Sequence, residues 1–353
     1  MVNFLLTLAV GFALGYAFYR LKVPGGMMVG SIFGVALLNI FWGISYMPSY
    51  AKYGAQIVVG AFIGCSVEKS DIQRLKYLIK PALVVLTAFL ILNITLGFAI
   101  YFISPLSLIT SLMSTIPGGL SDIPLISADM GADPPKVAAL QFIRMLVGIG
   151  LFPTLISIIA RRENKKATLE ESVILISPKE QVIPENHTPT VFVLTMVVAF
   201  AAGILGKILN IPAGTLLFSM IGVICFKLVL NKSYMPLWVK RFAQVLSGAY
   251  IGCFMGYSDV VELKYLLLPA LLLSLGYFAT CIIVGKVLSK YFGMSLKEAM
   301  LVATPAGASD MALISSDLGV QSTDLVVLQI IRLIVVVSVF PQIIHLIVTL
   351  VNK

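Results

Sequence analysis

Long apolar runs separated by short polar turns make up almost the whole chain. Four of the clearest runs extend from Val2 to Tyr19, from Pro81 to Ile103, from Val191 to Leu205 and from Leu325 to Leu350. A helix needs ~20 residues to cross the hydrocarbon core of a bilayer, and these runs reach or approach that length. The pattern therefore predicts an all-α integral membrane protein that crosses the bilayer many times.

The pattern occurs twice, at a spacing of 188 positions. Residues 1–165 align with residues 189–353 without a gap, so that Pro24 matches Pro212 and Pro153 matches Pro341. Two residues separated by this spacing are called repeat mates below. Internal duplication of this kind defines the architecture before any single residue is considered. The polar stretch 166–188 between the halves is predicted to be a solvent-exposed cytoplasmic linker.

Each half contains five predicted crossings and one interrupted stretch. In the first half the crossings are 2–19, 26–44, 51–67, 81–103 and 136–160, and the interrupted stretch is 105–131. The second half repeats this order, with its interrupted stretch at 296–319. The interruptions centre on residues 115–122 (TIPGGLSD) and 303–310 (ATPAGASD), which are called the first break and the second break. Proline ends a helix and glycine permits a reversal of the backbone, so each break predicts a turn at membrane depth.

The distribution of lysine and arginine indicates whether the interrupted stretches cross the bilayer. If each is a re-entrant helical hairpin that returns to its own side, the two halves are inverted and both termini are extracytoplasmic. The cytoplasmic side then carries nearly all basic residues outside the membrane, and the other side carries Lys52, Lys136, Lys207, Lys264 and Lys353. If the stretches cross fully, the charges divide far more evenly. The positive-inside rule therefore favours an inverted 5+5 repeat with two opposed hairpins, whose tips we expect to meet near the midplane.

The two breaks carry the candidate chemistry. Helix ends at a break leave backbone N–H and C=O groups unpaired, which suit an anionic solute and Na+ respectively. Substrate-binding candidates are the residues of both breaks and two arginines: Thr115, Gly118, Gly119, Ser121, Arg144, Thr304, Gly307, Ser309 and Arg332. Candidates for coupling to an ion are Asp122, Asp129, Asp310 and Asp317, and glutamines expected at the same cavity are Gln56, Gln141, Gln244 and Gln329.

Arg144 and Arg332 have two alternative roles. A charge near the centre of the bilayer is costly and marks a functional site by default. In the first alternative the arginines pair with aspartates of their own halves, purely to neutralise buried charge. In the second, at least one guanidinium binds an oxyanion of the substrate. Four aspartates stand against two arginines, which leaves two negative charges unbalanced. Either water solvates Asp129 and Asp317, or the surplus carboxylates form a proton or Na+ site.

Composition narrows the classes of function. The chain is 59% hydrophobic and 12% charged, with a mean hydropathy of +1.01. Its net charge of +9 lies mostly in short loops and indicates topology, so no nucleic-acid partner is expected. The four cysteines have neither metal-ligand nor disulfide spacing. No cofactor or resident metal is predicted, apart from Na+ or H+ as a coupling ion.

Two pairs of blocks resemble those of the AbrB-duplication family of bacterial inner-membrane proteins. They are the Pro-Gly-Gly-Leu-Ser-Asp block that ends at Asp122 and the Leu-Gln-Phe-Ile-Arg block that ends at Arg144, with their repeat mates. The resemblance covers both halves and implies a multi-pass protein of the inner, or cytoplasmic, membrane. Members have been labelled regulators of gene expression or ammonia monooxygenases, but no DNA-binding module or cluster of metal ligands supports either label here. The second break departs from the pattern in having Ala306 where the first has Gly118.

The layout is also similar to that of the sodium/glutamate and sodium/citrate symporters, which use inverted five-crossing repeats and work as dimers by an elevator motion. We therefore expect a secondary active transporter that moves a small polar, anionic organic solute with Na+ or H+, as a homodimer. The alternative is a membrane regulator that binds a ligand without moving it. A membrane enzyme is disfavoured because no nucleophile, base or metal constellation is apparent.

Overall fold

The computed structural model describes residues 2–164, 189–305, 315, 320 and 322–351. The predicted linker 166–188 and four site candidates, Gly307, Ser309, Asp310 and Asp317, lie outside the described residues. Every regular element in the described part is helical. The elements are α1 (Val2–Arg20), α2 (Gly26–Trp42), α3 (Ser49–Ser66), α4 (Lys69–Ile103), α5 (Leu108–Ser114), α6 (Ile123–Asp129), α7 (Pro134–Gly150), α8 (Phe152–Asn164), α9 (Pro189–Ile208), α10 (Gly214–Leu230), α11 (Leu237–Gly252), α12 (Tyr257–Glu262), η1 (Leu263–Leu266), α13 (Leu267–Phe292), α14 (Leu296–Val302) and α16 (Thr323–Val351).

Five stretches of helix are long and apolar enough to span a membrane: Val2–Arg20, Gln73–Ile103, Pro189–Ile208, Asp259–Phe292 and Asp324–Val351. The all-helical prediction and the membrane prediction are therefore confirmed at this level. Two shorter apolar helices, α2 and α10, are repeat mates and begin alike. Each follows a residue in the left-handed region, Gly25 at φ 64° and Ala213 at φ 58°.

The crossing predicted at 81–103 begins earlier than expected. Helix α4 starts at Lys69 and continues through Pro81. Its start is fixed by a capping box, in which the backbone N–H of Glu68 donates to the Asp71 carboxylate at 2.8 Å. In the second half the same path is broken into α12, η1 and α13, and Pro269 lies in the first turn of α13, where a proline costs least. The crossing predicted at 136–160 is likewise two helices, since α7 ends at Gly150 and α8 begins at Phe152.

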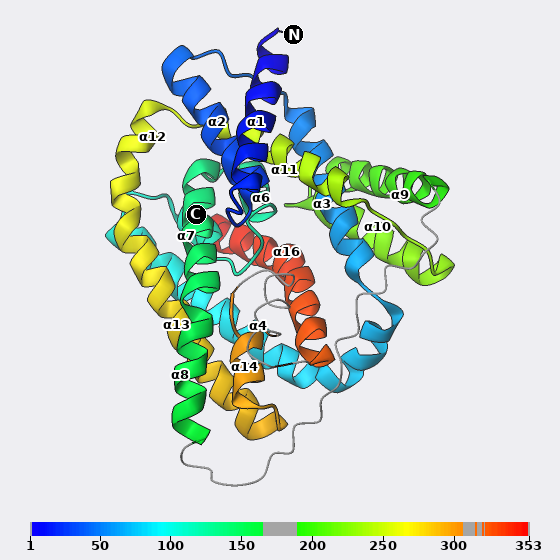
Figure 1. The fold of residues 1–353 in the computed structure, drawn as a ribbon, viewed down its shortest axis with the longest axis vertical. Coiled ribbons are helices and arrows are strands. Elements are labelled where there is room, and N and C mark those ends of the chain that lie inside the picture. The colour runs from blue at the N-terminus through cyan, green and yellow to red at the C-terminus, as the bar shows by residue number, and fades with distance from the viewer. Residues whose placement is uncertain (1, 165–188, 306–314, 316–319, 321, 352–353) are drawn as a thin grey trace.

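The helices form two bundles (Figure 1). Helices α1, α2, α3, α9, α10 and α11 pack mainly on one another and are called the support bundle. Helices α4 to α8, α12 to α14 and α16 pack mainly on one another and are called the core bundle. Between the bundles, α11 packs on α6 and α7, but over a much smaller surface than either bundle uses internally.

Glycines allow the helices of the support bundle to approach closely. A Cβ added at Gly60 of α3 would lie 2.5 Å from the Leu216 carbonyl oxygen of α10. Its repeat mate Gly248 of α11 lies equally close to the Met28 carbonyl oxygen of α2. Each half therefore packs a glycine face against the other half, so the two halves interlock. Close helix packing accounts for these glycines, because backbone atoms of the facing helix occupy the space that a side chain would need.

Candidate functional site

The first break separates α5 from α6 inside the core bundle. Helix α5 is capped at its start by Ser107, whose hydroxyl accepts from the Thr110 N–H, and it ends at Ser114. Helix α6 begins at Ile123 and ends before Gly131, which has a φ of 74°. Gly118 and Gly119 do not adopt positive φ. Their small size matters instead, because an added Cβ would lie 2.4 Å from Ile123 Cγ1 or from Asp122 Oδ2, respectively.

Gln141 and Arg144 bind the backbone of the first break from one face of α7. The Gln141 amide donates to the carbonyl oxygens of Ser114 at 3.1 Å and Ile116 at 3.0 Å. The Arg144 guanidinium donates from Nη1 to Ile116 O at 2.7 Å and from Nη2 to Gly118 O. Arg144 therefore binds carbonyl oxygens of the first break, just beyond the end of α5, and forms no ion pair with Asp122 or Asp129. Carbonyls near a helix end carry partial negative charge, which favours these contacts. Binding of a substrate oxyanion by Arg144 stays a prediction.

The second half repeats these contacts at the repeat-mate positions. Gln329 of α16 donates to Leu301 O at 2.9 Å and Val302 O at 3.3 Å, and Arg332 Nη1 donates to Thr304 O at 2.5 Å. Both arginines are almost fully buried, at 4% and 5% exposure. The Leu-Gln-x-x-Arg blocks thus hold the carbonyl groups at and just beyond the ends of α5 and α14 from the helix that follows each interrupted stretch.

Two further residues hold the first break, and sequence reasoning did not select either. The Asn93 amide of α4 donates to Leu112 O at 2.9 Å and to the Thr115 hydroxyl at 2.8 Å. The Tyr277 hydroxyl of α13 donates to Thr115 O at 2.7 Å. Both side chains are buried, at 0% and 1% exposure. A polar side chain in the middle of an apolar run was the available signal in each case.

The two arginines stand over a pair of aromatic rings. The guanidinium carbon of Arg144 lies 5.8 Å from the ring centroid of Tyr277, and that of Arg332 lies 5.8 Å from the ring centroid of Phe89. Phe89 and Tyr277 are repeat mates, and their ring centroids are 6.1 Å apart. The faces of the rings stabilise cations that are removed from water. Two positive charges are therefore concentrated in the centre of the core bundle.

Asp122 is a buried carboxylate at the start of α6. It is 6% exposed and occupies the N-cap position, but its side chain makes no capping hydrogen bond. Among the described residues no ion pair to Asp122 is formed, and the basic group that acts on it electrostatically is Lys240 of α11. Ser121 accepts a 3.3 Å hydrogen bond from Gln244 of the same helix. The first break therefore faces the support bundle with a hydroxyl and a carboxylate.

Asp129, at the far end of α6, has partners that were not expected. Lys52 Nζ lies 2.5 Å from Asp129 Oδ1, and the Gln56 amide donates to Oδ2 at 2.5 Å. Lys52 and Gln56 both belong to α3 of the support bundle, and the Lys52 side chain is only 7% exposed. Lys52 was predicted to be one of the basic residues on the extracytoplasmic side. Its side chain is buried and forms an ion pair with Asp129 of the core bundle. Gln56 does reach the interrupted stretch, as does Gln244.

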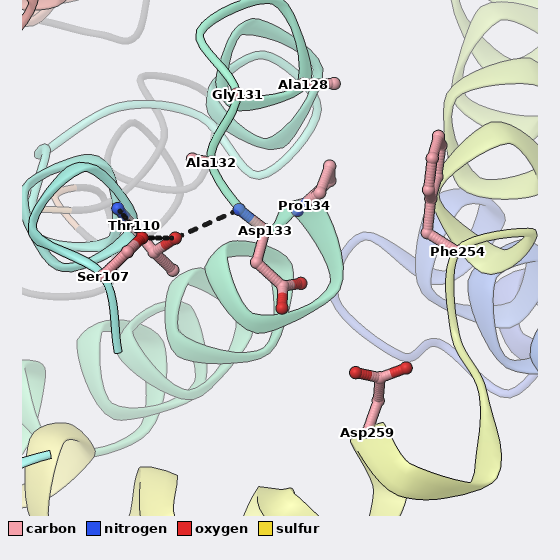
Figure 2. Close-up of a pocket in the computed structure, with 9 residues that line it drawn as sticks. All are labelled: Ser107, Thr110, Ala128, Gly131, Ala132, Asp133, Pro134, Phe254 and Asp259. Atoms are coloured by element: carbon pink, nitrogen blue, oxygen red, sulfur yellow. Dashed lines mark hydrogen bonds between the residues drawn. The ribbon is translucent and has the colours of Figure 1, made fainter. Parts of the chain in front are cut away.

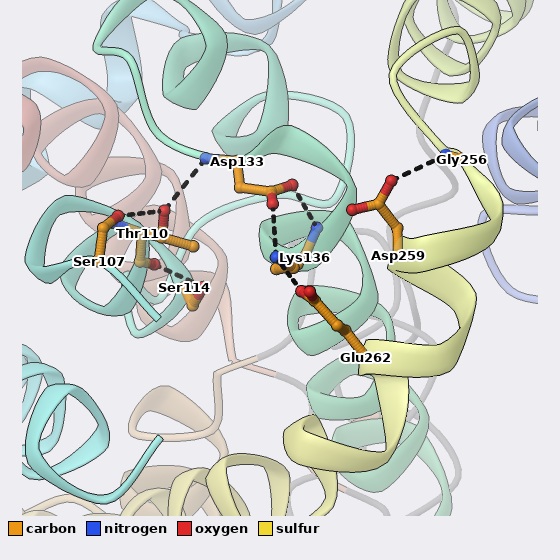
Figure 3. A network of polar contacts seen from close by, with 8 residues as sticks. All are labelled: Ser107, Thr110, Ser114, Asp133, Lys136, Gly256, Asp259 and Glu262. Carbon is orange, nitrogen blue, oxygen red and sulfur yellow. Dashed lines mark hydrogen bonds and ion pairs between the residues drawn. The ribbon is translucent and has the colours of Figure 1, made fainter. Parts of the chain in front are cut away.

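A cavity of about 380 Å³ opens where the two arms of the first interrupted stretch begin and end, not at the break itself (Figure 2). The carboxylates of Asp133 and Asp259 lie on opposite sides of it. Lys136 beside it binds Asp133 at 3.0 Å and Glu262 at 2.7 Å (Figure 3). The Asp133 carboxylate also caps α7, because it accepts a hydrogen bond from the Lys136 N–H at 3.3 Å.

Comparison with known proteins gives a consistent relationship over nearly the whole chain. The sequence profile of one family, described as "Transition state regulatory protein AbrB", matches residues 1–160 and again residues 164–348. A protein of Bacillus subtilis (strain 168), "Uncharacterized protein YhjN", is 25% identical over 350 residues, which cover 95% of this chain and 90% of that protein. "Putative regulator AbrB" of Escherichia coli (strain K12) is 24% identical over 343 residues, which cover 96% and 95% of the two chains.

The double match and the two relatives agree with the resemblance that the Pro-Gly-Gly and Leu-Gln-x-x-Arg blocks indicated. With its apolar helices of membrane-spanning length, this chain belongs to the AbrB family.

Proposed function

We propose that the protein is a secondary active transporter of a small polar, anionic organic solute, coupled to Na+ or H+. The observation that carries this proposal is the position of the first break. Its carbonyl groups are bound by α7 and α13 of the core bundle, and its Thr115 hydroxyl is bound by α4. Ser121, in contrast, meets α11 of the support bundle. A site at such a boundary changes its access when one bundle moves against the other.

The small contact between the bundles favours an elevator motion. The support bundle is interlocked by close glycine contacts, so it suits the part that stays fixed in the membrane. The core bundle holds both arginines and the first break, so it suits the part that moves with the solute. During such a movement the Lys52 to Asp129 pair and the Gln244 to Ser121 bond must break and be replaced.

The charges at the centre of the core bundle favour an anionic solute. Arg144 and Arg332 are both buried and lie over the adjacent rings of Tyr277 and Phe89. Two buried cations so close together raise the local potential, which attracts a carboxylate or another oxyanion. In this proposal the arginines act mainly through that potential, and the direct ligands are Ser121, Ser309 and backbone N–H groups of the breaks. Asp122 and Asp310 remain the candidates for coupling to the ion.

The finer topology belongs to the same proposal. We infer two inverted halves with re-entrant hairpins, both termini outside the cytoplasm, and a homodimer in the cytoplasmic membrane. The uneven distribution of lysine and arginine supports the inversion. No enzymatic turnover and no resident cofactor are part of the proposed mechanism.

A second candidate function is ligand sensing without transport, which the name of the Escherichia coli relative favours. A sensor and a transporter would share a binding site at the breaks. They differ in flux, because a sensor releases its ligand on the side from which it entered.

The proposal is tested with purified protein in proteoliposomes. A thermal-shift screen of carboxylates, amino acids, phosphonates and amines, with Na+ or choline, first identifies stabilising compounds, with succinate and glutamate as the initial probes. Counterflow of the radiolabelled compound then measures exchange across the bilayer. We expect exchange for at least one anion and none for amines. Stabilisation by an anion without any flux would contradict transport and support the sensor.

A further inference from the structure

The two breaks are held by different side chains, although their repeat mates align. Asn93, which binds the end of α5, has Cys281 as its repeat mate, and Tyr277, which binds Thr115 O, has Phe89. Gln141 and Arg144, in contrast, are matched by the identical residues Gln329 and Arg332. One pair of anchors is therefore identical for the two breaks, whereas the pair formed by Asn93 and Tyr277 serves the first break alone.

The anchors that differ are strong in the first half. Asn93 uses both an amide donor and its backbone oxygen: it donates to Leu112 O at 2.9 Å, and its carbonyl oxygen accepts from the Thr115 hydroxyl at 3.1 Å. Tyr277 adds a 2.7 Å hydrogen bond to Thr115 O. All of these atoms are buried, where a hydrogen bond is stronger than in water and its loss leaves a desolvated carbonyl.

The corresponding anchors are weak in the second half. Cys281 donates from its thiol to Met300 O at 3.2 Å, and Met300 is the repeat mate of Leu112. A thiol is a weak donor compared with an amide. Phe89 is buried in the place that corresponds to Tyr277 and has no hydroxyl to offer to Ala303, the repeat mate of Thr115.

We infer that Asn93 and Tyr277 are positioning residues that make the first break the fixed side of the site, while the end of α14 is held less firmly. That the breaks form a binding site rests on the proposed function, whereas the difference in anchoring is independent of it. Tyr277 belongs to the second half and binds the first break, so it also ties the two halves of the core bundle together at this point.

The same contacts limit which groups of the first break are available to bind an ion or a solute. The carbonyl oxygens of Leu112, Ser114, Thr115, Ile116 and Gly118 all accept hydrogen bonds from Asn93, Gln141, Tyr277 or Arg144. A Na+ ion would compete with these buried donors for the lone pairs of the carbonyl oxygens. The groups of the fixed side that are more open to a ligand are therefore the Ser121 hydroxyl and the Asp122 carboxylate.

Hydrogen exchange of the purified protein without any solute tests the inference, so its outcome is independent of whether transport is found. Tyr277→Phe removes one hydroxyl, and Asn93→Cys introduces the side chain of the repeat mate. Each variant is expected to exchange roughly tenfold faster in peptides that cover residues 112–123, as follows from losing a buried hydrogen bond. Peptides from α1 and α2 should be unchanged, and the control Tyr101→Phe, at an exposed tyrosine of α4, should leave all peptides unchanged.

The reverse substitution tests the asymmetry. Cys281→Asn gives the second half the amide donor of the first, and it is expected to slow exchange in peptides that cover residues 296–305. The inference is overturned if both Tyr277→Phe and Asn93→Cys fold with exchange of residues 112–123 within twofold of the parent protein. It is also overturned if either variant speeds exchange equally in peptides 296–305, or if Cys281→Asn produces no slowing there.

Discussion

Lys136 of α7 and Glu262 of α12 form an ion pair at 2.7 Å, and their repeat mates form another pair with the charges exchanged. The second pair joins Asp324 of α16 to Arg74 of α4 at 3.0 Å. Opposite charges are thus kept at equivalent places while their order is reversed. Each pair joins the helix that carries an arginine of the site to a helix of the other half, so the same tertiary relationship exists at both places.

The two pairs should differ in their contribution to stability. The side chains of Arg74 and Asp324 are nearly half exposed, so Asp324→Asn should cost less than about 1 kcal/mol. Lys136 is 18% exposed and binds two carboxylates, so Lys136→Met leaves two negative charges side by side and should cost more. The midpoint of thermal unfolding in detergent checks this order. Equal shifts for both variants would mean that burial does not govern these pairs.

Breaking the Lys52 to Asp129 pair should be strongly destabilising. Both groups are largely buried, so Lys52→Met or Asp129→Asn alone leaves one unpaired charge, at a cost of about 3–5 kcal/mol. The double variant Lys52→Met with Asp129→Asn should recover much of the loss, because no charge remains. A double-mutant cycle in thermal unfolding measures the recovery. Lys207→Met serves as the control, since that lysine lies over the ring of Tyr53 and not beside Asp129.

Gly119→Ala should disturb the site more than the fold. The added Cβ would meet Asp122 Oδ2 at 2.4 Å, and the flexible carboxylate can move away, whereas the backbone has no positive φ to oppose alanine. We expect a small change in the unfolding midpoint and at least about a tenfold loss of affinity for the stabilising anion, equal to roughly 1.4 kcal/mol. Gly54→Ala is the matched control, because no atom lies within 4 Å of its added Cβ. Unchanged affinity of Gly119→Ala for the anion would show that the position of Asp122 does not contribute to the site.

The Asp122→Asn variant should still exchange solute across the bilayer but should no longer accumulate it against a gradient. The Asp122 carboxylate is buried, and no ion pair to it is formed among the described residues. The neutral asparagine amide fits the same space but cannot take up a proton or bind a cation as a carboxylate does. Counterflow should continue, while uptake driven by a pH or Na+ gradient should be lost. Asp324→Asn, outside the breaks, should retain both activities. Gradient-driven uptake by Asp122→Asn at the rate of the parent protein would assign coupling to another residue.

The site candidates could be selected from the sequence, but their partners could not. Arg144 and Gln141 stand out because they are polar, buried by position and three residues apart. Their partners are backbone carbonyl oxygens near the end of a helix. A helix leaves its last carbonyls unpaired, and these cannot be identified until the residue at which the helix ends is known. Pro81 predicted a helix start, yet the capping box at Glu68 and Asp71 started α4 earlier, and packing of α4 against α13 and α16 supports the longer helix.

By itself the sequence determined what depends on local pattern and on its own repetition: an all-helical membrane protein, a duplicated sequence, and the break between α5 and α6. These follow from hydrophobicity, from the loss of an N–H donor at proline and from matching residues at a fixed spacing. Only the tertiary structure decided which groups meet across that spacing. Lys52 with Asp129, Tyr277 with Thr115 and Arg144 with Ile116 are brought together by helices that pack from distant parts of the chain, and buried polar groups take whichever donor or acceptor that packing supplies.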